Sequence, residues 1–155
     1  MKQLRLFVVA GILGFACTGI AGQVKPDGNR GDTEATEPKE GVFIHVTESY
    51  NNPRQVLMPM KMAVLMAVDK DVVVYMDLKS VELLVKGARD LSYPDFESFQ
   101  AYMKVLTGMG VKIYACPICL KISGYAPADL MDGVKLARKE ELIGSTKGRV
   151  ISMDY

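Results

Sequence analysis

Short runs of apolar and β-branched residues recur along the chain after residue 40, and each is long enough for one strand. The four clearest runs are residues 42–47, 72–76, 111–115 and 150–153, and a shorter one covers residues 134–137. Near-continuous apolar runs of this length are typical of parallel strands that are covered on both faces. The pattern therefore predicts a parallel sheet built from these segments.

Helical spacing of apolar residues fills the intervals between the strands. The expected helices cover residues 56–68, 81–88, 96–106 and 139–144. In the first, Pro59 is expected in the opening turn, where proline is tolerated. In the third, Asp95 is expected as the N-cap, and Gly108 or Gly110 as the end of the helix. The alternation of strands and helices predicts a three-layer α/β domain.

The beginning of the chain has the pattern of a targeting segment. Lys2 and Arg5 precede an apolar run over residues 6–16, and a small-x-small sequence ends at Ala21. A basic start, a short apolar run and small residues are typical of a secretory signal peptide, and the run is too short to span a bilayer comfortably. We therefore expect residues 1–21 to be a signal peptide of an exported, periplasmic protein.

Cys17 leaves a second interpretation of this segment open. It follows the apolar run directly, as the acylated first cysteine of a bacterial lipoprotein does, and such a modification would anchor the protein to a membrane. Of the three residues before it, Gly14, Phe15 and Ala16, only the small Ala16 matches the usual acylation motif. Ordinary cleavage after Ala21 is the preferred interpretation, and on either one Cys17 lies outside the folded domain.

The composition of the chain is that of a globular protein. Its 155 residues are 49% hydrophobic and 24% charged, which suits about one domain. The formal net charge of +1 gives no reason to expect nucleic-acid binding. Residues 22–40 differ, since they combine Pro, Gly, Asn, Asp, Thr and Glu with one large apolar residue, Val24. We expect a flexible linker there, followed by a folded domain over residues 41–155.

The strongest candidate site is Cys116-Pro117-Ile118-Cys119, directly after the third strand. Pro117 suits the first position of a helix, so Cys116 is expected as its N-cap. The unpaired backbone N–H groups and the helix dipole favour a thiolate at that position. Ligands of parallel sheets gather at the carboxyl ends of the strands, where Cys116 and the loop 48–54 are expected. We expect the Cys116 sulfur to be accessible to solvent.

Other interpretations of these residues also have a physical basis. The two cysteines could form an inert disulfide or be small core residues. A zinc site would need more ligands than the pair supplies, and His45, which lies in a predicted strand, is interpreted as a hydrogen-bonded core residue. Met58, Met60, Met62 and Met66 resemble a Cu(I) ligand series, but helical core packing is the preferred explanation. No metal, cofactor, hydrolase or nucleotide site is expected.

Taken together, these segments resemble the DsrE/DsrF-like family, which includes sulfur-relay proteins of tRNA thiolation and of dissimilatory sulfur oxidation. The resemblance covers residues 42–155, and its most specific part is the strand-end Cys116 followed eight residues later by Gly124. It implies a flavodoxin-like, mostly parallel sheet of about five strands. It also implies assembly as homo-trimers or hexamers.

The resemblance implies a chemistry for the cysteines as well. Active members carry a persulfide on the cysteine that corresponds to Cys116, accept sulfur from a donor and pass it to an acceptor thiol. Cys119 could resolve that persulfide by forming a disulfide. Many members have Arg-Gly where this chain has Ser123-Gly124.

Two other functions stay open: an exported thiol–disulfide redox protein using Cys116 and Cys119, and a non-enzymatic oligomeric binding module.

Overall fold

Five strands form a single parallel sheet in the computed structural model, which describes residues 38–144 and 147–155. The strands are β1 (Gly41–Val46), β2 (Asp71–Met76), β3 (Lys112–Ala115), β4 (Val134–Leu136) and β5 (Val150–Asp154). Their order is β4-β3-β2-β1-β5, and every neighbouring pair is parallel. The expected sheet is confirmed. The expected signal peptide, Cys17 and most of the expected linker lie outside the described residues.

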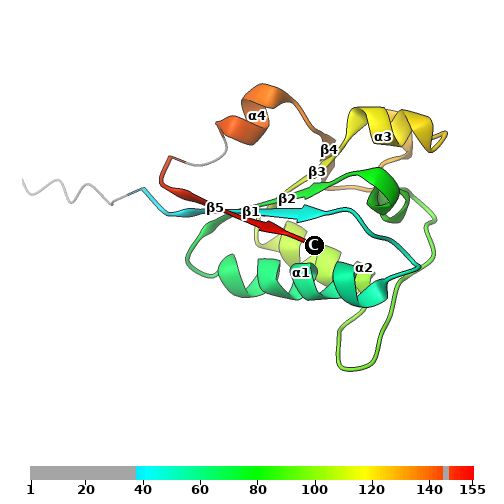
Figure 1. Cartoon of the computed structure of the whole chain (residues 1–155), viewed down its shortest axis with the longest axis horizontal. Helices are drawn as coiled ribbons and strands as arrows, with labels where there is room; N and C mark the ends of the chain where they lie inside the picture. The colour runs from blue at the N-terminus through cyan, green and yellow to red at the C-terminus, as the bar shows by residue number, and fades with distance from the viewer. Residues whose placement is uncertain (1–37, 145–146) are drawn as a thin grey trace, which may run out of the picture. The chain divides into compact units, whose positions relative to one another are not determined.

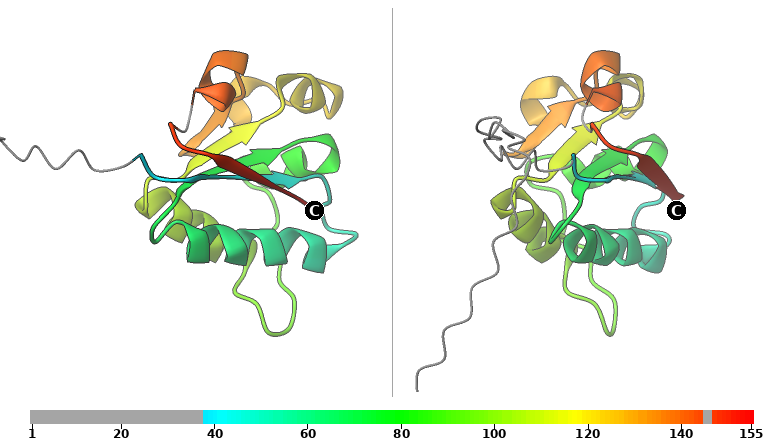
Figure 2. Two further views of the ribbon diagram at one scale, coloured as in Figure 1. Left: turned by 60° about the vertical axis from the view of Figure 1, so that its left-hand side comes forward. Right: turned by 90° about the vertical axis from the view of Figure 1, so that its left-hand side faces the viewer.

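Helices cover both faces of this sheet. The α-helices are α1 (Pro53–Met66), α2 (Phe99–Gly108), α3 (Pro117–Ile122) and α4 (Lys139–Ile143), and short 3₁₀ helices are η1 (Leu78–Leu84) and η2 (Pro127–Asp129). Figure 1 shows α1 and α2 on one side of the strands and α3 and α4 on the other, and Figure 2 shows the same layers from two further directions. This is the predicted three-layer, flavodoxin-like arrangement. None of the helices in the described ranges has the length and apolarity needed to cross a membrane.

The main core lies between the sheet and the layer formed by α1 and α2. The buried side chains that β1 and α1 contribute include Val42, Ile44, Val46, Val56, Leu57 and Met60. Burying one large aliphatic side chain contributes about 1.5–3 kcal/mol, so this layer supplies much of the stability of the domain. The opposite face of the sheet is covered less completely, because α3 and α4 are short. Phe43 and His45 on that face stay partly exposed.

Two details of the helices differ from the sequence prediction. Helix α1 begins at Pro53, not at Val56, so Pro59 lies inside the helix rather than in its opening turn. Proline is favoured at the first position of a helix, and Pro53 occupies that position in α1. Apolar periodicity does not reveal this start, because the residues that directly follow Pro53 are polar. Ser98, not Asp95, is the N-cap of α2, and its side chain accepts a hydrogen bond from the backbone N–H of Ala101 at 3.3 Å.

The segment expected as a helix over residues 81–88 is also shifted. The structure has the 3₁₀ helix η1 at Leu78–Leu84, three residues earlier. The chain then becomes extended at Val85, which pairs with Leu130 through an isolated bridge. The apolar residues are buried as predicted, but this bridge ends the helical turn. The predicted end of α2 is confirmed, since the helix stops at Gly108 and Gly110 has a φ of +76°.

Candidate functional site

Cys116 lies where β3 ends and α3 begins. Its backbone N–H donates to the Met76 carbonyl oxygen of β2 at 2.9 Å, which fixes the strand end against its neighbour. Cys116 has an extended backbone and Pro117 opens the helix. The Cys116 sulfur accepts a hydrogen bond from the Cys119 backbone N–H at 3.3 Å. The N-cap position predicted from the sequence is therefore the one that Cys116 occupies.

Four polar groups lie around the Cys116 sulfur. The Cys119 backbone N–H donates a hydrogen bond to it at 3.3 Å, and the Cys119 thiol, the Tyr75 hydroxyl and the Ile118 backbone N–H are close enough to favour its charged form. Burial by itself raises the pKa of Cys116, but these groups stabilise the thiolate and bring the pKa below that of an ordinary thiol. Because a thiolate is the nucleophilic form, the site favours reaction at Cys116.

Cys119 has the opposite tendency although it is one helical turn away. Burial raises its pKa first, and the neighbouring Cys116 side chain and the Asp77 charge raise it further. The Leu78 backbone N–H, which bonds to the Cys119 side chain, opposes this shift only in part. Both thiols are free. The pair therefore consists of one thiol that ionises readily and one that stays protonated beside it.

Cys116 is more enclosed than the sequence led us to expect. Its exposed fraction is 8%, and Cys119 is half-buried. The surface around Cys119 is apolar, because Leu78 of η1 and Ile118 and Ile122 of α3 are 61%, 69% and 80% exposed. A reaction partner would therefore approach Cys116 across an apolar surface.

Tyr75 comes to the cysteines from β2. In the parallel register it lies between His45 of β1 and Tyr114 of β3. Its ring stacks on Phe43, with centroids 6.0 Å apart, and packs at a tilt against His45 at 5.5 Å. Burial raises the pKa of Tyr75, and the neighbouring Cys116 thiolate raises it further. The phenol therefore stays protonated and keeps a proton that it can donate.

His45 is held between two carboxylates at the same end of the sheet. Its Nδ1 lies 3.0 Å from Asp154 Oδ1 of β5, and its Nε2 lies 3.0 Å from Asp77 Oδ1. His45 Nε2 and Asp77 Oδ1 are both buried and lie within ion-pair distance, but their geometry is not that of a hydrogen bond. The expected hydrogen bonding of His45 is confirmed, but the side chain is partly exposed and is not a core residue. Within the described ranges, no group of three or more His, Cys, Asp and Glu side chains could hold a metal ion.

The loop over residues 48–54 does not use its side chains at the cysteine pair. The Ser49 hydroxyl is buried and donates to the Glu82 carboxylate of η1. The Tyr50 hydroxyl donates to the Arg89 carbonyl oxygen at 2.7 Å. These bonds fasten the loop to the segment that follows β2. The sequence placed this loop at the correct end of the sheet, but its polar groups stabilise the fold there.

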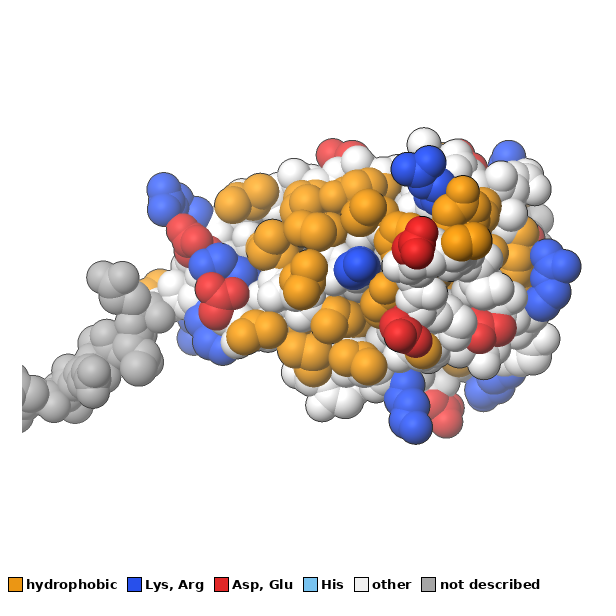
Figure 3. Space-filling model, turned by 90° about the horizontal axis from the view of Figure 1, so that it is seen from below, with side chains coloured by type: hydrophobic (Ala, Val, Ile, Leu, Met, Phe, Trp, Pro, Cys, Tyr) orange, Lys and Arg blue, Asp and Glu red, His pale blue; other side chains and the backbone are white. Residues whose placement is uncertain are grey.

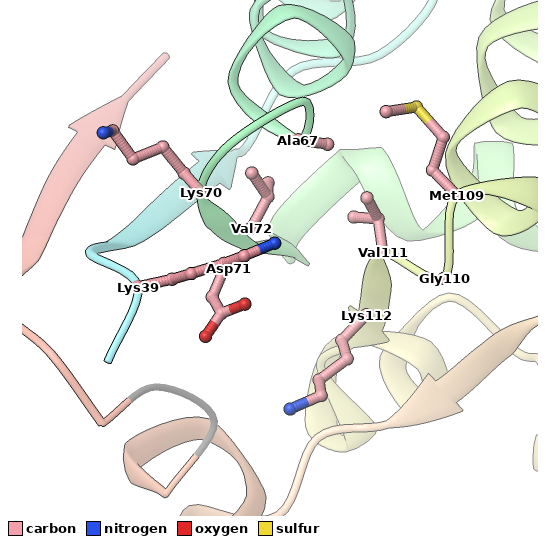
Figure 4. Close-up of a pocket in the computed structure, with 9 residues that line it drawn as sticks. All are labelled: Lys39, Ala67, Lys70, Asp71, Val72, Met109, Gly110, Val111 and Lys112. Carbon is pink, nitrogen blue, oxygen red and sulfur yellow. The ribbon is translucent and has the colours of Figure 1, made fainter. Parts of the chain in front are cut away.

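A separate hollow of about 190 Å³ lies at the other end of the sheet, where β2 and β3 begin (Figure 4). Lys39, Lys70 and Lys112 line it together with Asp71. Lys70 already pairs with Glu40 at 3.2 Å and with Asp69 at 3.1 Å. This hollow is built from groups of both charges and does not include the cysteine pair.

The two cysteines were predicted from the sequence, whereas the roles of Tyr75, Phe43 and Asp77 were not, and His45 was not expected at the site. The signal that could have found them is the strand register. Residues 45, 75 and 114 are neighbours only in the observed order of β1, β2 and β3. That order depends on which strands pair, and hydrophobic periodicity along one segment carries no information about pairing.

Known proteins share this fold. The model of the DsrE/DsrF-like family matches residues 40–151. The ychN protein of E. coli superposes with a TM-score of 0.59 and 17% identity, covering 74% of this chain and 99% of that one. MTH1491 of Methanobacterium thermoautotrophicum, described as a protein of unknown function, gives 0.54 and 22%, with coverages of 74% and 99%. No curated protein matches the sequence.

The matched region includes all of the elements that build the cysteine site. It begins before β1, contains β2, β3 and α3, and ends within β5. At these low identities the two solved structures establish a shared fold, whereas the family model covers most of the sequence itself. This chain therefore belongs to the DsrE/DsrF-like family.

Proposed function

We propose that this protein carries sulfane sulfur as a persulfide on Cys116 and transfers it between thiols of partner proteins. The observation that carries the proposal is the position of the Cys116 sulfur at the N-cap of α3, where it accepts a hydrogen bond from the Cys119 backbone N–H at 3.3 Å and has further donor groups close by. They stabilise the nucleophilic thiolate, while Cys119 beside it stays protonated. Membership of a family generally linked to sulfur relay supports the same chemistry.

Each transfer conserves atoms and electrons. In loading, the Cys116 thiolate attacks the outer sulfur of a donor persulfide, the S–S bond of the donor breaks, and its electron pair leaves on the inner sulfur of the donor. In unloading, an acceptor thiolate attacks the outer sulfur on Cys116, and the electron pair returns to the Cys116 sulfur. No external oxidant or reductant is consumed in either step.

Cys119 provides a second route out of the persulfide state. After losing its proton, Cys119 attacks the inner sulfur of the Cys116 persulfide, which forms a Cys116–Cys119 disulfide and releases hydrosulfide. The contact between the two side chains supports this step. Because only the thiolate attacks, the raised pKa of Cys119 makes this disulfide-forming step slow at neutral pH. The stored sulfur therefore survives long enough to meet an acceptor.

Intact-mass spectrometry after incubation with glutathione persulfide tests the proposal. The wild-type protein is expected to gain about 32 Da, the mass of one sulfur atom added to a thiol. Cys116→Ser is expected to gain nothing. Cys119→Ser is expected to keep the added sulfur longer than the wild-type protein. A sulfur adduct on Cys116→Ser at the wild-type level would contradict the assignment.

A thiol–disulfide redox function is the second candidate, because the two thiols contact each other. The same experiment distinguishes it. A redox protein would lose about 2 Da on forming the internal disulfide, would exchange with glutathione disulfide and would retain no sulfur adduct in Cys119→Ser. A bridge that resists reduction by glutathione would instead be structural.

We further propose that the protein acts in the periplasm after removal of residues 1–21 and that it forms homo-oligomers. The basic and apolar pattern of residues 1–16 supports export, and lipidation at Cys17 is the alternative that would place it on a membrane. The exposed apolar surface of α1 and α2 supports self-association. Its partners in the relay would be proteins that carry a persulfide or an acceptor thiol.

A further inference from the structure

We infer that Tyr75 is a third catalytic residue of the cysteine site, whose hydroxyl donates to the Cys116 sulfur when that sulfur is charged. Phe43 and His45 are positioning residues that hold the Tyr75 ring in place. The inference rests on the proposed function for its catalytic part. The effect of Tyr75 on the thiolate can be measured without any sulfur transfer.

The origin of the four polar groups distinguishes Tyr75 from the others. Three of them, from Cys119 and Ile118, belong to α3, the helix that Cys116 itself caps. Any cysteine at the N-cap of a helix faces backbone N–H groups of this kind. Tyr75 belongs to β2, a separate element, and pairs with Tyr114, two residues before Cys116. Because side chains two residues apart on a strand share one face of the sheet, the strand register places Tyr75 on the face of the Cys116 side chain. Its donor is therefore a feature of this site and not of helix capping in general.

The surroundings of Tyr75 fix the direction of its hydroxyl. The backbone is held by ladders to β1 and β3 on both sides. On the sheet face, the ring is stacked on Phe43 and packed against His45. His45 is in turn held by Asp154 and Asp77, 3.0 Å from each. A phenol oriented by packing loses little freedom when it donates to the sulfur.

The chemistry of transfer requires such a donor at the Cys116 sulfur. This sulfur is neutral in the persulfide and becomes negative as the bond to the outer sulfur breaks. A hydrogen bond to it is therefore stronger in the transition state and in the product than in the persulfide, which is the condition for acceleration. The Tyr75 phenol remains protonated because burial and the thiolate disfavour its ionisation. It can donate throughout the neutral pH range.

Tyr75→Phe tests this role, and the chain offers a matched control. Tyr114 lies beside Tyr75 in the register and is buried, whereas Tyr75 is half-buried, and the charged group that raises the pKa of Tyr114 after burial is Glu141 of α4. Both substitutions, made in a Cys119→Ser background, remove one hydroxyl and keep the ring. The charged groups at this end of the sheet, Asp77, Asp154 and His45, are unchanged in every variant.

The measurements are the pH profile of Cys116 alkylation by iodoacetamide and the rate of sulfur transfer from loaded protein to a small thiol. For Tyr75→Phe we expect the midpoint of the profile to rise by about one pH unit, as for loss of one hydrogen bond to a charged group, and the transfer rate to fall roughly tenfold. Tyr114→Phe is expected to leave both unchanged. A 3-fluorotyrosine at position 75, which is a stronger donor, is expected to move the midpoint downwards.

Two results would overturn the inference. One is an unchanged midpoint in Tyr75→Phe, and the other is an equal shift in Tyr114→Phe, which would indicate a general loosening of the sheet. If Tyr75→Phe does not fold, the protein with 3-fluorotyrosine at position 75 still tests the inference, and an unchanged midpoint in that protein would contradict it. A shifted midpoint in a protein that takes up no sulfur would refute the proposed function and the catalytic part of the inference, while supporting the effect of Tyr75 on the thiolate.

Discussion

Two side chains of the same chemical type ionise differently in this molecule because they face different partners. Burial disfavours the charged form of both Cys116 and Cys119. Cys116 receives enough donors to reverse that effect, whereas Cys119 faces the Cys116 sulfur and the charge of Asp77. Cys116 is therefore the nucleophile and Cys119 the protonated thiol because of the neighbours of each residue. The sequence Cys-Pro-Ile-Cys alone does not specify which of the two ionises.

This difference predicts opposite effects of pH on stability. The lowered pKa of Cys116 means that its ionisation stabilises the folded state. That contribution is complete above the ordinary thiol pKa and is lost as the pH falls through the lowered one. The raised pKa of Cys119 has the opposite sign, so its contribution is complete below the ordinary thiol pKa and is lost as the pH rises through the raised one.

The single-cysteine variants separate the two contributions. In Cys119→Ser, the free energy of unfolding is expected to rise with pH as the Cys116 thiol ionises. In Cys116→Ser it is expected to fall with pH above the ordinary thiol pKa. Urea unfolding at a series of pH values measures both, with the double serine variant as the baseline. Identical pH dependences in the two single variants would contradict the assignment.

At the scale of elements, the sequence was most informative where one segment determines its own structure. The strands, the N-cap at Cys116 and the stop at Gly108 follow from local patterns and are as predicted. The predicted N-cap of α2 was wrong: Asp95 and Ser98 are both residue types that cap helices well, and the local pattern did not distinguish them. Asp95 instead occupies a left-handed turn, with a φ of +68°. Tyr75 could not be found, because its role depends on pairing between strands distant in sequence.

The corrected start of α2 gives a stability prediction. Ser98→Ala removes the side-chain acceptor for the Ala101 N–H and is expected to lower the free energy of unfolding by about 1 kcal/mol. Ser98→Asp keeps an acceptor, adds a charge that the helix N-terminus favours, and is expected to retain wild-type stability. Thermal or urea unfolding compares the two. Equal stability of Ser98→Ala and the wild-type protein would mean that this cap does not stabilise α2.

At the scale of the whole molecule, the cysteine pair and the exposed apolar surface of α1 and α2 lie on different sides of the sheet. The cysteine pair is at the start of α3, on the side opposite α1 and α2 (Figure 1). The outer surface of α1 and α2 carries many exposed apolar side chains (Figure 3). They include Met58 and Leu65 of α1 and Val105 of α2, and Val68 and Met109 in the turns that follow these helices are exposed as well. Copies that associate through this surface would leave every Cys116 available to partner proteins.

This separation predicts that oligomerisation can be removed without removing sulfur binding. Leu65→Glu places a charge on the exposed surface of α1, where its burial against a second copy would be costly. We expect the wild-type protein to have the mass of a trimer or hexamer in multi-angle light scattering, and Leu65→Glu to have that of a single chain. Both are expected to form the Cys116 persulfide.

Ile122→Glu is the matched control, because it makes the same change at an exposed apolar residue of α3, beside the cysteine pair. It should keep the wild-type mass and instead slow transfer to a protein acceptor, which must approach Cys116 across this apolar surface. If Ile122→Glu dissociates the assembly and Leu65→Glu does not, the copies associate through the cysteine side of the sheet. Sulfur transfer would then take place at an interface between subunits.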